Sequence, residues 1–581
     1  MKTRLRHVAA VAAASLIPAA AAGGAARAQQ PETAPAPAAA RPNVLFIAVD
    51  DLKPLLGCYG DATVRTPAID RLAARGVLFE RAYCNQAVCA PSRNALMTGM
   101  RPQTLGIYDL ATNFRRSAPE SVTLAQSFLK AGYRTEAIGK IMHLGHGNRE
   151  DAASWSVPHA HPGGLYASPA TLADIRKRTQ EARARGGGGG AAAEARGPAT
   201  ESADVPDSAY GDGKVADEAI KRLRGAAKEK PGQPFFLAVG FYKPHLPFCA
   251  PKKYWDLYDP AKFSLAQPQA APVGAPDFAP QYGGELRNYH GIPKQGVLPA
   301  GMQRHLIHGY HAATSYMDAQ VGRVLDELDA SGLAKNTIVV LWGDHGWHLG
   351  DHGMWCKHTN YEQAARIPLI VAGPGAKAGV RTRSLVETVD LYPTLCALAG
   401  VPSAATQTLE GVSFAPVLGD PAAKTRDSII HVYPRGQGLL GRAVRTERHR
   451  LVEWKKPGAP ADTAVFELYD YEADPLETRN LAAEQPDVLA RLRAVLAKHP
   501  EAKPQISAGP RPAAAGRQSR AALFARRDAN GDGKLTFEEF MTGQPDPEAA
   551  KGRFPSFDTN KDGVLSKEEF VTSGGKNPGA S

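Results

Sequence analysis

The sequence predicts an α/β fold, and three observations support this prediction. Continuous apolar runs at residues 44–49, 235–240 and 337–342 have the length and pattern of strands buried on both faces. Stretches with helical periodicity separate these runs, and the longest of them covers residues 305–328. The chain has 581 residues, of which 43% are hydrophobic, so it can bury a large core and form more than one domain.

The N-terminus has the pattern of a secretory signal peptide. Basic residues, an apolar run and a small-x-small site follow one another: Lys2, Arg4 and Arg6, then Val8 to Ala22, then Ala26-Arg27-Ala28. We therefore expect residues 1–28 to be a signal peptide that is cut after Ala28, and the protein to be secreted or periplasmic. A membrane anchor is the alternative, but the run is short, and no later stretch has the ~20 apolar residues of a membrane span. Residues 29–40, rich in Pro, Ala and Gln, are expected to be a disordered linker.

The charge and cysteine content narrow the possible functions. The chain has 69 basic and 58 acidic residues and a net charge of +11, which suits a polyanionic substrate, nucleic acid or a membrane surface. The basic residues are scattered and form no stripe with aromatic residues, so nucleic-acid binding is not expected. A polyanionic substrate and a merely solvated basic surface remain as alternatives. Six cysteines in so long a chain do not indicate a disulfide framework, and the sequence does not show which of them pair.

Polar side chains follow two of the predicted buried strands. Asp50 and Asp51 come directly after the strand at 44–49, and Asp344 and His345 come just after the strand at 337–342. Ligands of open α/β sheets bind at the carboxyl ends of the strands, and hard oxygen donors select calcium or magnesium. These four residues are therefore candidate metal ligands. The alternative for the two adjacent acids is that they only cap the next helix.

Cys89 opens the segment Cys89-Ala90-Pro91-Ser92-Arg93, which follows a predicted helix at 68–75 and a strand at 77–82. Proline suits the first turn of a helix because its missing N–H would be unpaired there. We therefore expect Cys89 at a helix N-terminus, where free N–H groups and the macrodipole favour a reacting group that gathers negative charge. From the residue type alone, a buried thiol without a function is the alternative.

Two further predicted strands end in loops that each carry a lysine and a histidine: residues 134–138 before Lys140 and His143, and residues 235–240 before Lys243 and His245. Helices at 121–132 and 216–223 precede these strands. On their own, a solvated lysine and an incidental histidine would explain each pair. Only the family resemblance given below makes these two pairs candidates for the site.

Two segments between the predicted strands lack a regular pattern. Residues 167–208 are polar and rich in Gly and Ala, and we expect them to form a flexible insertion. Residues 249–300 are rich in Pro, Gly and aromatic residues, and we expect a long loop near the mouth of the site. A strand at 368–372 and a helix at 391–398 are expected to close the main domain.

The segment around Cys89 resembles the signature of the type I sulfatases. It reads Cys-x-Pro-Ser-Arg and continues to Thr98-Gly99. Five separated motifs recur in the order of that family, and they are most similar to those of the iduronate-2-sulfatases. Three of them cover residues 43–51, 56–60 and 86–93. The resemblance extends over about residues 41–505.

The resemblance implies an alkaline-phosphatase-like sandwich. In this fold a large mixed central β-sheet flanked by helices would form a catalytic domain of residues 41–427, and a small antiparallel sheet subdomain would cover residues 428–503. The resemblance also implies that a formylglycine-generating maturation enzyme oxidises Cys89 to formylglycine. The hydrated aldehyde would offer one hydroxyl to attack sulfur and a second to expel the sulfate. The implied substrate is a sulfated saccharide, in particular a 2-O-sulfated uronic acid.

The resemblance also implies a role for each site residue. Calcium is the implied metal, with Asp50, Asp51, Cys89, Asp344 and His345 as its ligands. Arg93 would orient the diol, and three lysines would offset the charge on the sulfate: Lys140, Lys243 and Lys357. His143 is the candidate base for sulfate release, and His245 would contact the sulfate and protonate the leaving alcohol. The expected catalytic residues are Cys89, Arg93, Lys140, His143, His245 and Lys357, and the expected substrate-binding residues are Lys140, Lys243, His245 and Lys357.

Two tandem loops near the C-terminus have the spacing of calcium-binding EF-hands. Each carries oxygen donors at loop positions 1, 3, 5 and 12 and a glycine at position 6. The expected ligands, with position 7 included, are Asp528, Asn530, Asp532, Lys534 and Glu539 in the first loop, and Asp558, Asn560, Asp562, Val564 and Glu569 in the second. We therefore expect a linker at residues 504–522 and a paired EF-hand with two calcium ions at residues 523–572.

Two other functions compete with that of a sulfatase. A phosphomonoesterase or phosphodiesterase of the alkaline phosphatase superfamily would have similar strand-end ligands. It would normally need a Ser or Thr nucleophile and a second metal site, whereas this chain has Cys89 at the matching position. A calcium-dependent binding protein with an inactive sulfatase-like domain would have lost active-site residues, and none of the expected positions is lost. Formylglycine in the peptide that spans Cys89 would favour the sulfatase over both alternatives.

Overall fold

The computed structural model describes residues 41–184, 196–229, 232–403, 406–508, 520–542 and 547–572. The expected signal peptide, the linker at 29–40, the glycine run at 186–190 and most of the linker at 504–522 lie outside the described residues. Among the described helices, none combines the length and the apolar character that a membrane crossing requires.

A seven-stranded sheet forms the centre of the main domain, and its strand order is β13-β2-β12-β8-β1-β6-β4. β1 pairs in parallel with β6 and β8, whereas β12 runs antiparallel to β8 and β2, so the sheet is mixed as predicted. The strand bounds are Val380–Thr382, Gly76–Phe79, Leu369–Ala372, Thr337–Gly343, Asn43–Val49, Phe235–Phe241 and Arg134–Gly139, in that order. The three predicted apolar runs are β1, β6 and β8, the adjacent strands at the middle of the sheet.

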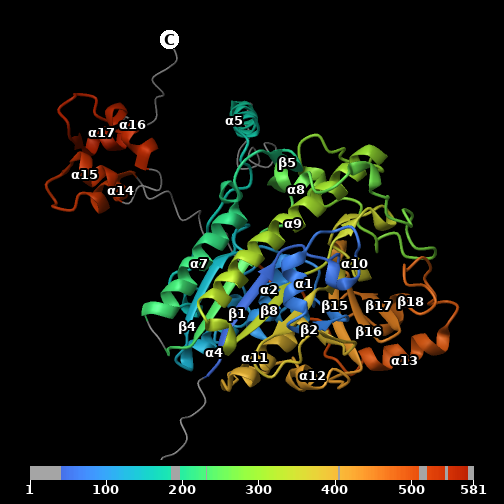
Figure 1. Cartoon of the computed structure of the whole chain (residues 1–581). Helices are drawn as coiled ribbons and strands as arrows, with labels where there is room; N and C mark the ends of the chain where they lie inside the picture. The colour runs from blue at the N-terminus through green and yellow to red at the C-terminus, as the bar shows by residue number, and fades with distance from the viewer. Residues whose placement is uncertain are drawn as a thin grey trace, which may run out of the picture. The chain divides into compact units, whose positions relative to one another are not determined.

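Helices cover both faces of this sheet (Figure 1). Alternate residues of β1 point to opposite faces, and they belong to two separate hydrophobic cores. Leu45, Ile47 and Val49 share a core with α1 (Pro67–Ala73), α7 (Gly211–Glu229) and α9 (Ala300–Ala330). Val44, Phe46 and Ala48 share the other core with α2 (Cys89–Thr98), α4 (Leu124–Lys130) and α11 (Leu391–Ala399). Figure 1 shows α7 and α9 lying side by side along one face.

A second, four-stranded antiparallel sheet follows in the chain, with the order β15-β16-β17-β18. Its strands are Ser428–Pro434, Leu440–Thr446, His449–Lys455 and Val465–Asp470, and α13 (Pro486–Leu496) packs on it. This agrees with the predicted small C-terminal subdomain. At its end, the amides of Lys503 and Ile506 donate to the carbonyls of Gln103 and Gly106, so the last residue of the subdomain and the start of the expected linker contact the main domain.

The expected flexible insertion at 167–208 is ordered over most of its described length, and that prediction was wrong there. Residues Pro169–Ala184 form α5, and β5 (Thr200–Ala203) pairs in parallel with β7 (Phe248–Pro251). Alanine and long charged side chains are good helix formers, so a polar, Ala-rich composition suits an exposed helix as well as a flexible segment.

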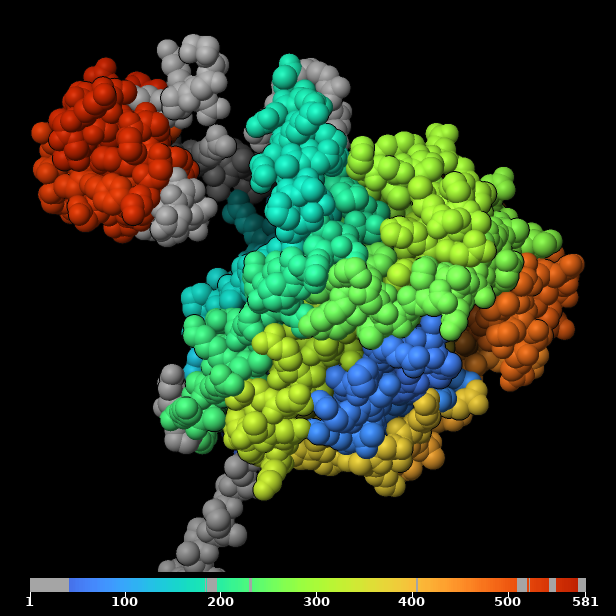
Figure 2. Space-filling view, turned by 45° about the horizontal axis from the view of Figure 1, so that its top comes forward, coloured from blue at the N-terminus to red at the C-terminus, as the bar shows by residue number. Residues whose placement is uncertain are grey.

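The segment 249–300 is a long, mostly irregular loop, as predicted. It contains α8 (Lys252–Trp255) and a 3-10 turn at Glu285–Asn288. Its middle part contacts the C-terminal subdomain through the bridge between Val273 and Arg479 and the hydrogen bond from Asn480 to the Gly274 carbonyl. Figure 2 shows this green segment beside the orange one on the surface.

Short elements complete the main domain. The strands β3, β11 and β14 form a small sheet, and β9 pairs with β10. Their bounds are Ala82–Tyr83, Arg366–Ile367, Val386–Glu387, His348–Leu349 and Trp355–Cys356. The short helices α3, α10 and α12 are Pro102–Leu105, Glu362–Ala365 and Ala415–Gly419.

The C-terminal described residues form two helix-loop-helix units. Their helices are α14 (Arg520–Arg527), α15 (Phe537–Met541), α16 (Pro547–Phe557) and α17 (Lys567–Thr572), and β19 (Lys534–Leu535) pairs with β20 (Leu565–Ser566) between the two loops. A cluster of phenylalanines forms their own core. In the first loop, Asp528 accepts hydrogen bonds from the amides of Asp532 and Gly533, so its carboxylate points into the loop.

Candidate active site

The two predicted acid pairs meet at the carboxyl ends of β1 and β8. These strands run in parallel with Val49 opposite Gly343, and the Asp344 amide donates to the Val49 carbonyl. Consecutive residues of a strand point to opposite faces, so two adjacent acids can share one site only if the chain leaves the strand between them. Asp51 makes this change with a φ of 58°, a left-handed conformation in which Asp is several-fold enriched. Its amide donates to Asp344 Oδ1 at 3.1 Å.

Cys89 is the first residue of α2, as predicted, and its thiol faces both strand ends. Its Sγ lies 3.4 Å from Asp50 Oδ1, 3.3 Å from His345 Nε2 and 3.6 Å from Lys140 Nζ. The residue is only 2% exposed. Burial, followed by the nearby charge of Asp50, raises the pKa of the thiol. The helix N-terminus therefore brings Cys89 to the acids without leaving it open to solvent.

All five predicted metal ligands lie in one cluster. Two overlapping groups have their ligand atoms within 4.8 Å of one another: Asp50, Cys89, Asp344 and His345, and Asp50, Asp51, Cys89 and His245. The three carboxylates are at most 1% exposed, and buried carboxylates need a compensating cation. Carboxylate oxygens with one imidazole suit a hard divalent cation such as calcium. The residues present therefore fit a metal ion. His245 also lies next to this cluster, although the sequence did not indicate it as a metal ligand.

Three cationic side chains contact the carboxylates of the cluster. Arg93 Nε donates to Asp344 Oδ2 at 2.9 Å, Lys140 Nζ donates to Asp50, and Lys357 Nζ donates to Asp51 Oδ1 at 2.9 Å. Burial opposes the ionisation of Asp50, but Lys140, His245 and Arg93 outweigh it and hold its pKa well below the usual range. Arg93 also donates to the carbonyls of Lys140 and Ile141, so it ties α2 to the end of β4.

Lys357 lies on a strained loop. The residues on both sides of it have positive φ values, 84° at Cys356 and 33° at His358. Such conformations cost of order 1–3 kcal/mol each and persist where the surroundings hold them. The loop directs the ammonium group of Lys357 inward, where it is almost fully buried against Asp51.

Lys243 and His245 lie on one loop, but only the histidine faces the carboxylates. His245 Nε2 lies 3.9 Å from a carboxylate oxygen of each of Asp50 and Asp51. Lys243 Nζ instead donates to the carbonyls of His245 and Pro247, at 2.9 and 2.6 Å. The lysine thus holds the loop that carries the histidine, and the expected contact of Lys243 with the sulfate stays a prediction.

His143 lies on the wall of the cavity beside the site. Its Nε2 is 3.1 Å from His146 Nδ1, and its buried Nδ1 has no hydrogen-bond partner among the described residues. Burial, followed by the charge of Lys140, lowers the pKa of His143 to about 3. The imidazole is therefore neutral at physiological pH, as a base must be before it accepts a proton.

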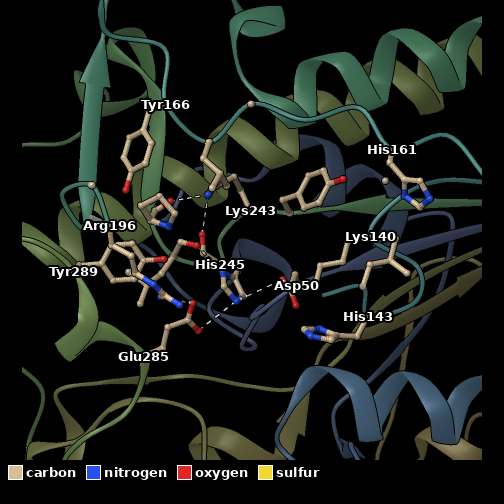
Figure 3. A pocket seen from close by; sticks show the side chains of 18 of the residues that line it. Asp50, Lys140, His143, His161, Tyr166, Arg196, Lys243, His245, Glu285 and Tyr289 are labelled. Carbon is tan, nitrogen blue, oxygen red and sulfur yellow. Dashed lines mark hydrogen bonds and ion pairs between the residues drawn. The ribbon is translucent and has the colours of Figure 1, made fainter. Parts of the chain in front are cut away.

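A cavity of about 830 Å³ opens over the cluster, a size that falls within the range of small-ligand sites. Asp50, Lys140, His143, Lys243 and His245 lie on one part of its wall, as Figure 3 shows. The other part comes from Tyr166 and from the segments without a regular sequence pattern that follow it: Leu172, Ile175, Arg196, Glu285 and Tyr289. The helix α5 therefore contributes to the cavity through Leu172 and Ile175.

Glu285 is a site residue that the sequence reasoning missed. Its Oε2 lies 3.4 Å from His245 Nε2, and its Oε1 lies 3.6 Å from Arg196 Nη1 (Figure 3). The same Oε2 lies 3.3 Å from Lys357 Nζ. Burial opposes its ionisation, but His245 and Lys357 lower its pKa well below the usual range, so it is an anion. No motif marks it, because it lies in the irregular segment 249–300. The only sequence signal for Glu285 is the expectation that this loop lies near the mouth of the site.

Glu285→Gln is expected to lower kcat/KM for a sulfate ester by about 10- to 100-fold. The amide keeps the shape of the side chain but removes the charge that holds His245 and Lys357 together, so both groups would be less well placed. Asp277→Asn, an exposed acid of the same loop, is the matched control and should retain wild-type kinetics. Equal kinetics for wild type and Glu285→Gln would show that Glu285 positions neither group.

Comparison with known families agrees with this geometry. The sulfatase family profile matches residues 42–401. A profile for the C-terminal part of N-sulphoglucosamine sulphohydrolase matches residues 350–501, and EF-hand profiles match residues 520–543 and 553–572. The first two matches cover the described cluster and the four-stranded sheet, and the third covers the two helix-loop-helix units.

Individual relatives point to the same family. Iduronate 2-sulfatase of Mus musculus is 38% identical over 62% of this chain and 69% of its own length, and the Homo sapiens protein is 34% identical over 76% and 90%. A solved structure of the phosphonate monoester hydrolase from Silicibacter pomeroyi superposes with a TM-score of 0.63 at 23% identity, over 79% of this chain and 95% of that one, and it shows the shared fold. Since the family profile matches more than half of its length and the human relative is 34% identical over 90% of its own length, this chain belongs to the sulfatase family of sulfuric ester hydrolases.

Proposed function

We propose that this sulfatase is secreted and removes the 2-O-sulfate of a uronic acid at the end of a saccharide chain, with formylglycine at position 89 and calcium in the active site. The observation that carries the proposal is the convergence of Cys89, three buried carboxylates, Arg93 and two lysines at one pair of strand ends. The identity to iduronate 2-sulfatases supports the uronic acid. The cavity of about 830 Å³, lined by Asp50, Lys140 and His245, has room for a saccharide end.

The metal would be held by Asp50, Asp51, Asp344, His345 and the oxidised side chain at position 89. Calcium bound there would lower the pKa of a hydroxyl at position 89 and withdraw charge from the sulfate oxygens. Hydrated formylglycine would supply two geminal hydroxyls, one that attacks sulfur and one whose deprotonation expels the sulfate.

The protein side chains would complete the reaction. Arg93, fixed by Asp344, would keep the position-89 side chain in line with the sulfur atom. Lys140 and Lys357 lie against Asp50 and Asp51 and would stabilise the charge that develops on the sulfate oxygens. His245 would give a proton to the leaving sugar oxygen, and neutral His143 would accept the proton that accompanies sulfate release.

Three further parts of the proposal rest on the sequence. Residues 1–28 would direct secretion, a maturation enzyme would oxidise Cys89, and the two EF-hand loops would each hold calcium through the expected ligands. We assign residues 41–427 to the catalytic domain, 428–503 to its subdomain and 523–572 to an EF-hand pair with its own core. Calcium is abundant outside cells, so the loops would be filled permanently rather than act as a switch.

A substrate panel tests the proposed specificity. The wild-type enzyme is expected to desulfate an oligosaccharide with a terminal 2-O-sulfated uronic acid, with kcat/KM at least about 100-fold above that for a 6-O-sulfated glucosamine or an aryl sulfate. The reason is that sugar contacts in the cavity add to the binding of the transition state. Released sulfate is the measurement, and an aryl phosphate serves as the control for phosphoesterase activity. Activity confined to small aryl sulfates would overturn the substrate assignment.

A further inference from the structure

Three side chains after β4 form a cluster that the proposed reaction does not use. Glu150 Oε2 lies 2.5 Å from His159 Nδ1 and 3.6 Å from His161 Nε2. One ligand atom of each residue lies within 4.8 Å of the other two. His159 is only 2% exposed at its side chain, and the other two are partly exposed. The cluster is therefore a small polar site of two imidazoles and one carboxylate.

The backbone around the cluster is fixed. The segment that carries both histidines lies along the end of β4, because the Gly139 amide donates to the Ala160 carbonyl and the Ala160 amide donates to the Ala137 carbonyl. The rings of His159 and His161 lie 3.9 Å apart between centroids, and Trp155 packs edge-on against His159. The three donors are thus held in place by a strand end and a packed tryptophan.

His159 and Glu150 each make a further hydrogen bond of the kind that supports metal ligands. His159 Nε2 lies 2.9 Å from the Gly139 carbonyl, to which it must donate its N–H. Trp155 Nε1 donates to Glu150 Oε1 at 3.0 Å and leaves Oε2 toward the histidines. Metal-bound histidines almost always donate their other N–H to a carbonyl or carboxylate, and metal-bound carboxylates are themselves hydrogen-bonded. The cluster has both features.

The geometry of the cluster suits a shared cation. Because Nε2 of His159 donates to the Gly139 carbonyl, Nδ1 is the ring atom that faces the carboxylate oxygen of Glu150, at 2.5 Å. Two acceptors at this distance repel unless a proton or a metal ion lies between them. A proton on Nδ1 would satisfy this one pair, whereas a metal ion would also take His161 Nε2, which lies 3.6 Å from the same oxygen.

We propose that Glu150, His159 and His161 bind one divalent transition-metal ion, with zinc as the occupant that fits best. Two imidazoles and one carboxylate are the donor set of zinc sites that keep a fourth position for water or a ligand. Zinc bonds of about 2.0–2.2 Å put tetrahedral ligand atoms about 3.4 Å apart. His161 and Glu150 already have this separation, and Glu150 would move about 1 Å from His159.

This site is separate from the catalytic cluster in chemistry and in residues. The catalytic cluster has three carboxylates and suits a hard cation, whereas nitrogen donors favour zinc over calcium. The two sites are connected through the fold, because the carbonyl that accepts from His159 belongs to Gly139, directly before Lys140. His161 also lines the cavity, on the part of the wall that carries Lys140 and His143 in Figure 3. A zinc ion here would fix the strand end that presents Lys140.

Zinc titration of the full-length protein in excess calcium tests the proposal. We expect one zinc ion per chain in addition to bound calcium, measured by elemental analysis after desalting and by competition with a zinc-sensitive dye. His159→Gln with His161→Gln should weaken zinc binding by at least about 100-fold. His290→Gln removes an exposed histidine elsewhere and should bind zinc like wild type. Asp344→Ala should also retain zinc, because it alters only the catalytic cluster.

A second variant keeps the proposal testable if the double histidine variant does not fold. Glu150→Gln keeps the side-chain size and should lose zinc while circular dichroism and EF-hand calcium stay unchanged. Cobalt in place of zinc should give the absorption bands of a four-coordinate site in wild type but not in Glu150→Gln. Three results would each overturn the proposal: no zinc uptake at micromolar concentrations, equal uptake by wild type and both variants, or loss of zinc in Asp344→Ala alone. If no zinc were taken up, a proton rather than a metal ion would lie between His159 and Glu150.

Discussion

Cys89→Ser is expected to lower the turnover of a sulfate ester by at least about 1,000-fold. The maturation system for cysteine does not convert serine, and a serine hydroxyl cannot expel sulfate as the second hydroxyl of a hydrated aldehyde would. Serine should fit the buried position between Asp50 and His345, so the variant should fold and keep its metal ligands from the strands. Sulfate release under multiple-turnover conditions is the measurement.

The control for Cys89→Ser is Cys58→Ser. Cys58 is partly exposed and lies outside the described site, so its variant should have wild-type turnover. Mass spectrometry of the peptide that spans position 89 should show formylglycine in wild type and in the control. Near-native multiple turnover by Cys89→Ser would contradict the formylglycine assignment. An unmodified thiol in an active wild-type enzyme would contradict it as well.

Asp344→Ala is expected to lower the turnover of a sulfate ester about as much as Cys89→Ser does. It removes a carboxylate from the metal cluster, and it leaves the buried guanidinium of Arg93 without its partner at 2.9 Å. The Asp51 amide loses an acceptor in the same change. We expect calcium content to fall from about three to about two ions per chain, since two EF-hand loops and one catalytic site are proposed. Elemental analysis and sulfate release are measured on the same sample.

A complementary variant controls for the location of the lost calcium. Glu539→Gln combined with Glu569→Gln removes the acid at position 12 of both EF-hand loops and should lower calcium content while sulfate turnover remains. The two variants should thus separate structural from catalytic calcium. If Asp344→Ala retained both its full calcium content and its activity, the assignment of Asp344 to the metal site would be wrong.

The sequence was most informative where a buried strand ends in polar residues. The runs before Asp50 and Asp344 are apolar on both faces, which indicates central strands, and parallel neighbours place their carboxyl ends together. The pairing of β1 with β8 therefore brings residues that are far apart in the chain into one cluster. Cys89 was predictable for a similar reason, because the proline two residues later marks the start of a helix.

The sequence was least informative where tertiary contacts alone decide the structure. Glu285 lies in a loop without periodicity, and only its contacts with His245 and Lys357 mark it as part of the site. The helix α5 has a composition that suits both a helix and a flexible segment, so composition could not decide between them. Lys243 follows a strand as Lys140 does, but its ammonium turns to the carbonyls of its own loop, which no spacing rule predicts.

The burial of Cys89 limits when an enzyme can modify it. The thiol is 2% exposed, and it lies between Asp50, which precedes it in the chain, and His345, which follows 256 residues later. An enzyme that must enclose a segment around Cys89 can act only before His345 closes over it. At 5–20 residues per second, ribosomes take roughly 13–50 s to make the intervening chain. The proposed oxidation of Cys89 would therefore have to precede the folding of the site, and a chain that folded first would keep its thiol.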